Sequence, residues 1–68
     1  MENWKLIFTT RSLPQASIIK GMLEENNIPV MLENKQDSVY VMFGDIKLYV
    51  PTHLEDVAKD LMDQGLVN

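Results

Sequence analysis

Few side chains in this sequence could carry out chemistry, and they are widely spaced. His53 is the only histidine, so no second imidazole can complete a histidine metal pair. Glu33, Asp37 and Asp45 could converge on a hard cation, but they lack the spacing of an EF-hand loop. Ser12 has no G-x-S-x-G context, and the glycines are too isolated to form a phosphate-binding loop. We therefore expect no enzyme activity, no catalytic residue, no metal site and no cofactor.

The size and charge of the chain bound its class further. Its 68 residues make a single domain, residues 1–68, and a chain of this length buries only about 60% of its unfolded surface. Ten acidic residues outnumber six scattered basic ones, which argues against nucleic-acid binding. The absence of cysteine excludes disulfides and thiolate zinc sites. We find neither a signal peptide nor an apolar run of about 20 residues, so we expect a cytoplasmic protein without membrane contact.

The first predicted element is a strand over residues 4–10, because this segment is rich in aromatic and β-branched residues. Strict alternation would place Leu6 and Phe8 on one face. It would place Lys5, Ile7 and Thr9 on the other.

A helix should follow. Ser12 and Gln15 have the spacing of a capping box, and Asn26-Asn27 is a plausible left-handed stop. The helical stripe comprises Ala16, Ile19 and Leu23, widened by Ile18 and Met22.

Three more strands are predicted, over residues 28–33, 39–43 and 46–50. Pro29 cannot donate a hydrogen bond to a ladder, which favours an edge or strand-end position. Gly44-Asp45 separates the last two strands as a two-residue hairpin turn. In that register Ile46, Leu48 and Val50 share one face, and a slip of one residue would destroy the sorting.

The last element should be a helix. Thr52 and Glu55 have capping-box spacing, and Gly65 is typical of the residue that ends a helix. The apolar positions with helical period are Leu54, Val57, Ala58, Leu61 and Met62.

The predicted order is therefore β-α-β-β-β-α. This order favours an α+β, two-layer, ferredoxin-like sandwich with two helices on one face of a mostly antiparallel sheet. The face without helices would then be open to a partner. Its predicted contact residues are Ile7, Met31, Tyr40, Met42 and Tyr49.

The polar segment 34–38 allows a second interpretation. As a turn it reverses the chain, because Asn, Asp and Ser side chains hydrogen-bond nearby backbone. Loops on rigid scaffolds also carry function, and the start of a helix can bind an anion. The candidate ligand residues are Arg11, Asn34, Lys35 and Asp37.

Several segments resemble a small bacterial family described as putative prokaryotic signal-transducing proteins, a domain of unknown function. They are the strand ending in Thr9-Thr10, the helix carrying Leu23-Glu24, Ile28-Pro29 after it, and Leu48-Tyr49-Val50-Pro51 before the last helix. The resemblance covers nearly the whole chain. It implies a ferredoxin-like fold similar to that of PII nitrogen-regulatory proteins. PII proteins bind nucleotides with a long loop and glycine-rich segments, neither of which this chain has.

Two functional hypotheses follow. The first is a non-enzymatic regulatory module that contacts a protein partner, or a second copy in a homodimer, through the open sheet face. The second is a sensor of an anionic metabolite or nucleotide that uses residues 34–38 and the start of the first helix.

Overall fold

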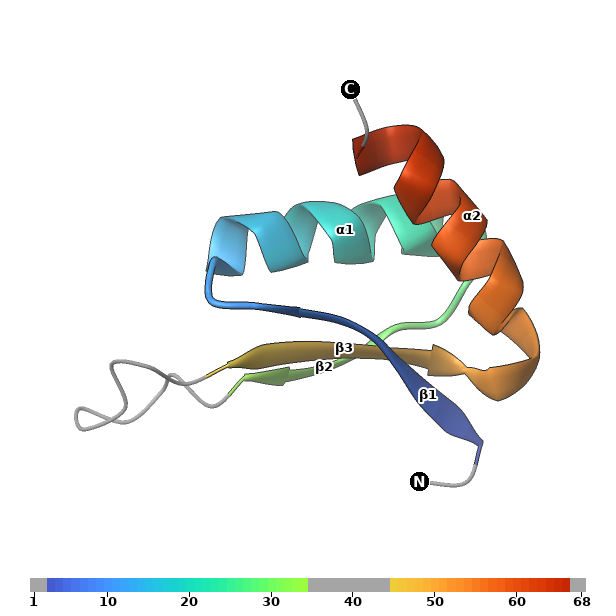
Figure 1. The fold of residues 1–68 in the computed structure, drawn as a ribbon, viewed down its shortest axis with the longest axis horizontal. Coiled ribbons are helices and arrows are strands. Elements are labelled where there is room, and N and C mark those ends of the chain that lie inside the picture. The colour runs from blue at the N-terminus through green and yellow to red at the C-terminus, as the bar shows by residue number, and fades with distance from the viewer. Residues whose placement is uncertain (1–2, 35–44, 67–68) are drawn as a thin grey trace.

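The computed structural model describes residues 3–34 and 45–66, which form two layers. In chain order the elements are β1 (Trp4–Thr10), α1 (Leu13–Glu25), β2 (Met31–Asn34), β3 (Ile46–Pro51), the 3-10 turn η1 (Thr52–Leu54) and α2 (Glu55–Leu66). Figure 1 shows both helices on the same face of the sheet, which confirms the predicted α+β class. The predicted strand over residues 39–43 and the turn residue Gly44 lie outside the described residues. The predicted hairpin partner of β3 was wrong, because β1 and β2 pair with its two edges.

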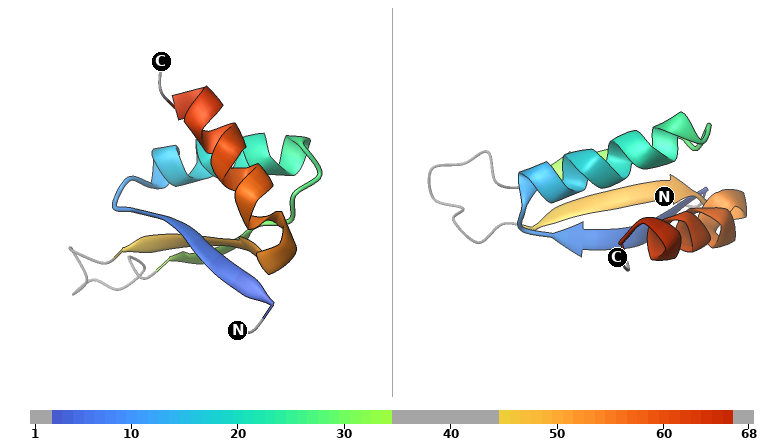
Figure 2. Two further views of the ribbon diagram at one scale, coloured as in Figure 1. Left: turned by 45° about the vertical axis from the view of Figure 1, so that its right-hand side comes forward. Right: turned by 90° about the horizontal axis from the view of Figure 1, so that it is seen from above.

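The described strands form one sheet in the order β1-β3-β2, and β3 is antiparallel to both neighbours. β1 and β2 therefore run in the same direction, with β3 inserted between them and α1 crossing over it. This split β-α-β arrangement is ferredoxin-like. Seen from above in Figure 2, α1 lies over the sheet while α2 lies close to β1.

The core lies between the helices and the central strand. Ile46, Leu48 and Val50 are each 0% exposed, as their predicted alternation requires. Burying a side chain of this size contributes about 1.5–3 kcal/mol. The other buried apolar residues are Ala16, Ile19, Leu23, Ile28, Ala58 and Met62. None of the described polar side chains is buried.

The predicted stop of α1 forms and Ser12 caps its start, but only half of the predicted capping box forms, because the N–H of Ser12 donates to Thr10 Oγ1 and not to the Gln15 side chain. The backbone N–H of Gln15 donates to Ser12 Oγ at 3.2 Å, so Ser12 is the N-cap. Asn27 has φ of 65°, in the left-handed region that asparagine tolerates better than most residues. Ile18, predicted to widen the buried stripe, is instead 68% exposed.

The second strand is shorter than predicted. It begins at Met31 rather than at residue 28, because Ile28 still belongs to the turn that ends α1. The N–H of Ile28 donates to the carbonyl of Leu23 at 3.0 Å, and the Ile28 side chain is buried in the core. Pro29 has no N–H to give to a strand. Ladder pairing therefore starts only beyond it.

The C-terminal helix differs from the prediction at both ends. Thr52 begins a 3-10 turn, and α2 follows from Glu55. Gly65 lies inside α2 and has no positive φ, so its predicted role as a helix-ending residue was wrong. A Cβ at Gly65 would lie 2.9 Å from Met22 Sδ of α1. The glycine instead allows the two helices to approach closely.

Two exposed helical glycines allow a matched test of this close approach. We expect Gly21→Ala to raise the free energy of unfolding by about 0.5–1 kcal/mol, because no atom crowds the new methyl group. Gly65→Ala should gain less, because Met22 Sδ must move away. Urea denaturation measures both. In a Met22→Ala background, Gly65→Ala should raise the free energy of unfolding by more than it does in the wild type. An unchanged effect would contradict the close approach of the two helices at Gly65.

Candidate functional site

A row of apolar side chains crosses the sheet on the face that carries no helix. The strand pairing places Leu6 of β1 and Met31 of β2 on either side of Tyr49 in β3. Residues opposite one another in antiparallel strands share a face. Tyr49 lies between the buried residues Leu48 and Val50 in β3. Because side chains alternate along a strand, Tyr49 points away from the core. Leu6 is 44% exposed, Met31 is 36% exposed and Tyr49 is partly buried.

A polar row borders the apolar one. Thr9 and Glu33 lie on either side of Lys47, again across all described strands. Opposite charges at facing positions favour the pairing of strands. On the other side of the apolar row, Trp4 pairs with Pro51. We call the surface made by these three rows the open face.

The prediction that Ile7 belongs to the open face was wrong. The register between β1 and β3 shifts between Leu6 and Phe8, so Ile7 is an extra residue at a bulge. Ile7 is partly buried and packs against the core, whereas Leu6 points outward. Three apolar residues follow one another here, Leu6, Ile7 and Phe8. This run was the feature of the sequence that indicated a break in simple alternation.

The bulge also moves Lys5, which was predicted on the open face. Lys5 pairs opposite the buried Val50, on the helix-covered face. There it contributes to the electrostatics of α2. The pKa of Glu55 is lowered, mainly by a hydrogen bond from Lys59; desolvation opposes this effect, and the charges of Lys59 and Lys5 add smaller contributions that lower the pKa further. Lys59 Nζ lies 2.9 Å from Glu55 Oε2.

The remaining predicted contact residues divide into two pairs. Met31 and Tyr49 are brought together on the open face, as facing residues of neighbouring strands. Tyr40 and Met42 lie outside the described residues. Leu6, which was not predicted on the open face, joins Met31 and Tyr49 there.

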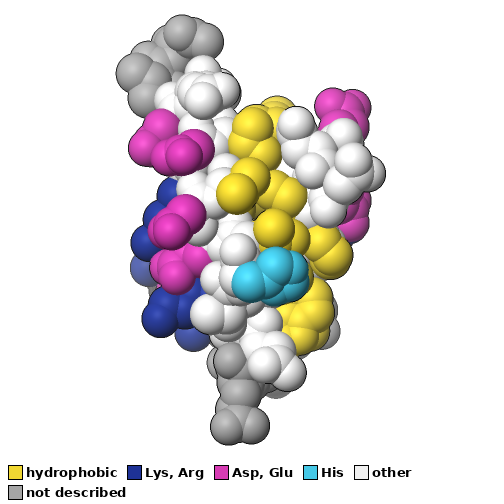
Figure 3. Space-filling view, turned by 90° about the vertical axis from the view of Figure 1, so that its right-hand side faces the viewer, with side chains coloured by type: hydrophobic (Ala, Val, Ile, Leu, Met, Phe, Trp, Pro, Cys, Tyr) yellow, Lys and Arg dark blue, Asp and Glu magenta, His cyan; other side chains and the backbone are white. Residues whose placement is uncertain are grey.

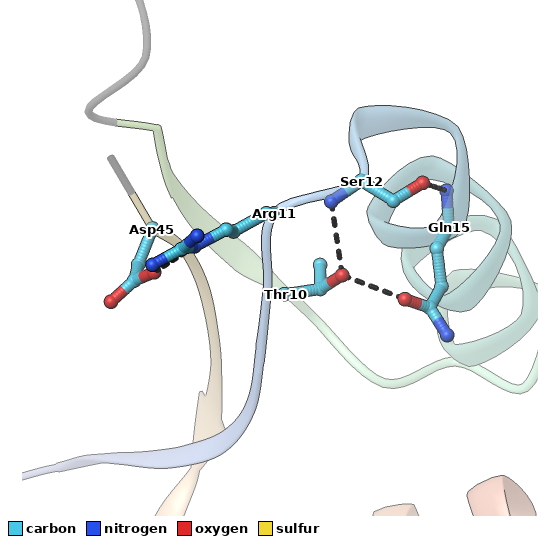
Figure 4. Close-up of polar contacts among 5 residues, drawn as sticks. All are labelled: Thr10, Arg11, Ser12, Gln15 and Asp45. Atoms are coloured by element: carbon cyan, nitrogen blue, oxygen red, sulfur yellow. Dashed lines mark hydrogen bonds and ion pairs between the residues drawn. The ribbon is translucent and has the colours of Figure 1, made fainter. Parts of the chain in front are cut away.

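The start of α1, the other candidate site, is occupied by local hydrogen bonds (Figure 4). Thr10 Oγ1 donates to Gln15 Oε1 at 2.6 Å and accepts from the N–H of Ser12 at 3.0 Å. Arg11 Nε lies 3.7 Å from Asp45 Oδ1, in an exposed ion pair. This carboxylate reduces the positive charge that Arg11 offers to an anion.

The structure does bring Arg11 and Asn34 to one end of the sheet. Thr10, which precedes Arg11, and Asn34 both pair with Ile46, beside Asp45. Lys35 and Asp37 lie outside the described residues. The ligand role of these four residues stays a prediction.

The described residues also include one open pocket next to the open face. Its volume is about 480 Å³, and it is lined by Asn3, Trp4, Pro51, Thr52 and His53. Among residues 3–34 and 45–66, no three histidine or acidic side chains cluster as metal ligands would. Neither described helix is long and apolar enough to span a membrane.

Comparison with known proteins adds one finding. Residues 4–65 match the model of a family described as "Putative prokaryotic signal transducing protein". The chain belongs to this family. The match runs from the start of β1 to the last turn of α2, so it covers every described helix and strand. No curated protein and no solved structure matches the chain.

The position of Lys5 under α2 can be tested through Glu55. Replacing Lys59 with Met removes the hydrogen bond that lowers the pKa of Glu55, so that pKa should rise towards its ordinary value. Lys5→Met should raise it by less, since Lys5 acts only through its charge. An NMR titration of the glutamate carboxyl carbons measures both.

The matched control is Lys47→Met, because Lys47 lies on the open face and should leave the pKa of Glu55 unchanged. An equal effect of Lys5→Met and Lys47→Met would contradict the bulge. Because the folded-state pKa is lowered, the contribution of Glu55 to stability is present at neutral pH and is lost as the pH falls through that pKa.

Proposed function

We propose that this member of the signal-transducing family is a non-enzymatic regulatory module that acts in the cytoplasm by protein–protein contact through the open face. The observation that carries the proposal is the apolar row of Leu6, Tyr49 and Met31, which neither helix covers. Contiguous apolar surface often marks an interaction site, and tyrosine and methionine are enriched in interfaces.

The form of the open face also suits protein contact. The apolar row runs across the sheet, with the Thr9–Lys47–Glu33 row on one side and the Trp4–Pro51 pair on the other. An apolar centre with a polar border is the usual anatomy of a protein interface. A chain of 68 residues also gains stability by burying such a face in an assembly.

The chemistry-bearing side chains that the structure describes support a non-enzymatic role. Ser12 caps α1, and Arg11 pairs with Asp45, so both have structural partners. His53 is exposed in η1. Binding through a preformed surface needs none of these groups to transfer a proton or attack a substrate.

The experiment is a comparison of Tyr49→Lys with the wild type. Tyr49 is the centre of the apolar row, so a charged side chain there should abolish association while the monomer stays folded. Sedimentation velocity across a concentration series measures self-association, and pull-down from a bacterial lysate measures capture of another protein. Leu13→Lys is the control, because Leu13 is an exposed apolar residue that lies on α1, away from the open face.

We expect Tyr49→Lys to lose the dimer, or the captured protein, and Leu13→Lys to keep it. If the wild type is a monomer at every concentration, the homodimer is excluded and the proposed partner is a different protein. If Tyr49→Lys matches the wild type in both experiments, the proposal is wrong.

A further inference from the structure

A second apolar surface lies on the helical side of the molecule, away from the open face. Leu54 at the end of η1 and Val57 and Leu61 of α2 follow at intervals of three and four residues, so they line one flank of this helical segment. Val57 is 49% exposed, while Leu54 and Leu61 pack partly against the core. Figure 3 shows apolar side chains gathered in a continuous strip on this side of the molecule.

Acidic side chains flank this apolar strip. On α2, Asp56, Asp60 and Asp63 are exposed, and their spacing places them together on the solvent side of the helix. At the end of α1, Glu24 and Glu25 are also exposed. Figure 3 shows acidic side chains on both sides of the strip, with lysine and arginine side chains beyond the acids on one side.

Few basic residues neutralise these acids. The ion pairs found among the described residues link Lys20 to Glu24, Lys59 to Glu55, and Arg11 to Asp45. None of them includes the three aspartates of α2 or Glu25. The flanks of the strip therefore keep a net negative charge.

The pocket next to the open face adjoins this strip. The chain's only histidine, His53, lines the pocket and lies against the strip in Figure 3. The indole of Trp4 and the ring of Pro51 give the pocket apolar walls, and Asn3 and Thr52 add polar groups. Pockets of this kind accept a single large anchor side chain in many protein interfaces.

From these observations we propose that the strip binds a basic amphipathic helix of a partner protein. The apolar side of such a helix would lie along the strip, as helices do in hydrophobic grooves, with one anchor side chain in the Trp4 pocket. Lysine and arginine on its borders would face the acids of α2 and α1. The strip is distinct from the apolar row of Leu6, Tyr49 and Met31, and the two surfaces meet at Trp4 and Pro51, which line the pocket and border the open face.

The negative charge on the flanks of the strip favours a basic helix over two other possible occupants. A second copy of the chain carries a formal net charge of −4 and would bring a second set of acids to the contact. An anionic membrane surface would be repelled in the same way. A basic segment is attracted by both flanks at once, and the attraction should weaken as salt increases.

The test uses two designed helical peptides with the same leucine face. One carries lysine at every polar position and the other carries glutamate. Fluorescence of Trp4, the chain's only tryptophan, reports binding at the pocket, and amide chemical shifts of the whole chain locate the contact. We expect the lysine peptide to bind and to shift residues of α2, and the glutamate peptide not to bind.

Matched variants separate charge from apolar contact. The double variant Asp56→Lys/Asp60→Lys should bind the lysine peptide about tenfold or more weakly than the wild type does. Val57→Ser should also lower the affinity for this peptide. Glu33→Lys and Leu13→Ser make the same kinds of change elsewhere and should have little effect. Tyr49→Lys should also leave peptide binding intact, which separates this proposal from the role of the open face.

Three results would overturn the proposal. The first is no binding of the lysine peptide. The second is equal binding of both peptides. The third is a double aspartate variant that binds no worse than Glu33→Lys. The aspartates are exposed, so their replacement should not unfold the chain, and circular dichroism of each variant checks this.

Discussion

The structure depends on the strict alternation of β3. This strand pairs with β1 on one side and β2 on the other, and its inward side chains, Ile46, Leu48 and Val50, are completely buried beneath the helices. A slip of one residue would bring Lys47 and Tyr49 into the core, and the core has no polar partner for an ammonium group. The register of the central strand therefore determines which residues form the core and which face outward.

Much of the fold followed from local patterns. The alternation of β3, the Ser12 cap and the stop at Asn27 each have a short-range physical cause that the sequence shows directly. The errors arose where a distant element decided the outcome. Ile7 became a bulge because the register of β1 against β3 shifts there, and Gly65 stayed helical where Met22 of α1 lies close to it.

The candidate site divides in the same way. Met31 and Tyr49 were predictable because they lie on strands with regular alternation. Leu6 was missed because one extra residue in β1 exchanges the faces of the residues before it. The acid-flanked strip on α2 was missed as well, since it appears only when the end of α1 and the flank of α2 are placed side by side. Helical periodicity predicts the apolar flank of a helix, but it does not predict what lies next to it.

The most direct test of this account concerns the bulge, because it sets the composition of the open face. The chain has no cysteine, so a single introduced cysteine reports only on its own position. Reaction with a thiol reagent should be fast in Leu6→Cys, whose parent side chain is 44% exposed, and several-fold slower in Ile7→Cys, which packs against the core. Faster reaction at position 7 than at position 6 would contradict the bulge, and with it the surface through which we propose that the protein acts.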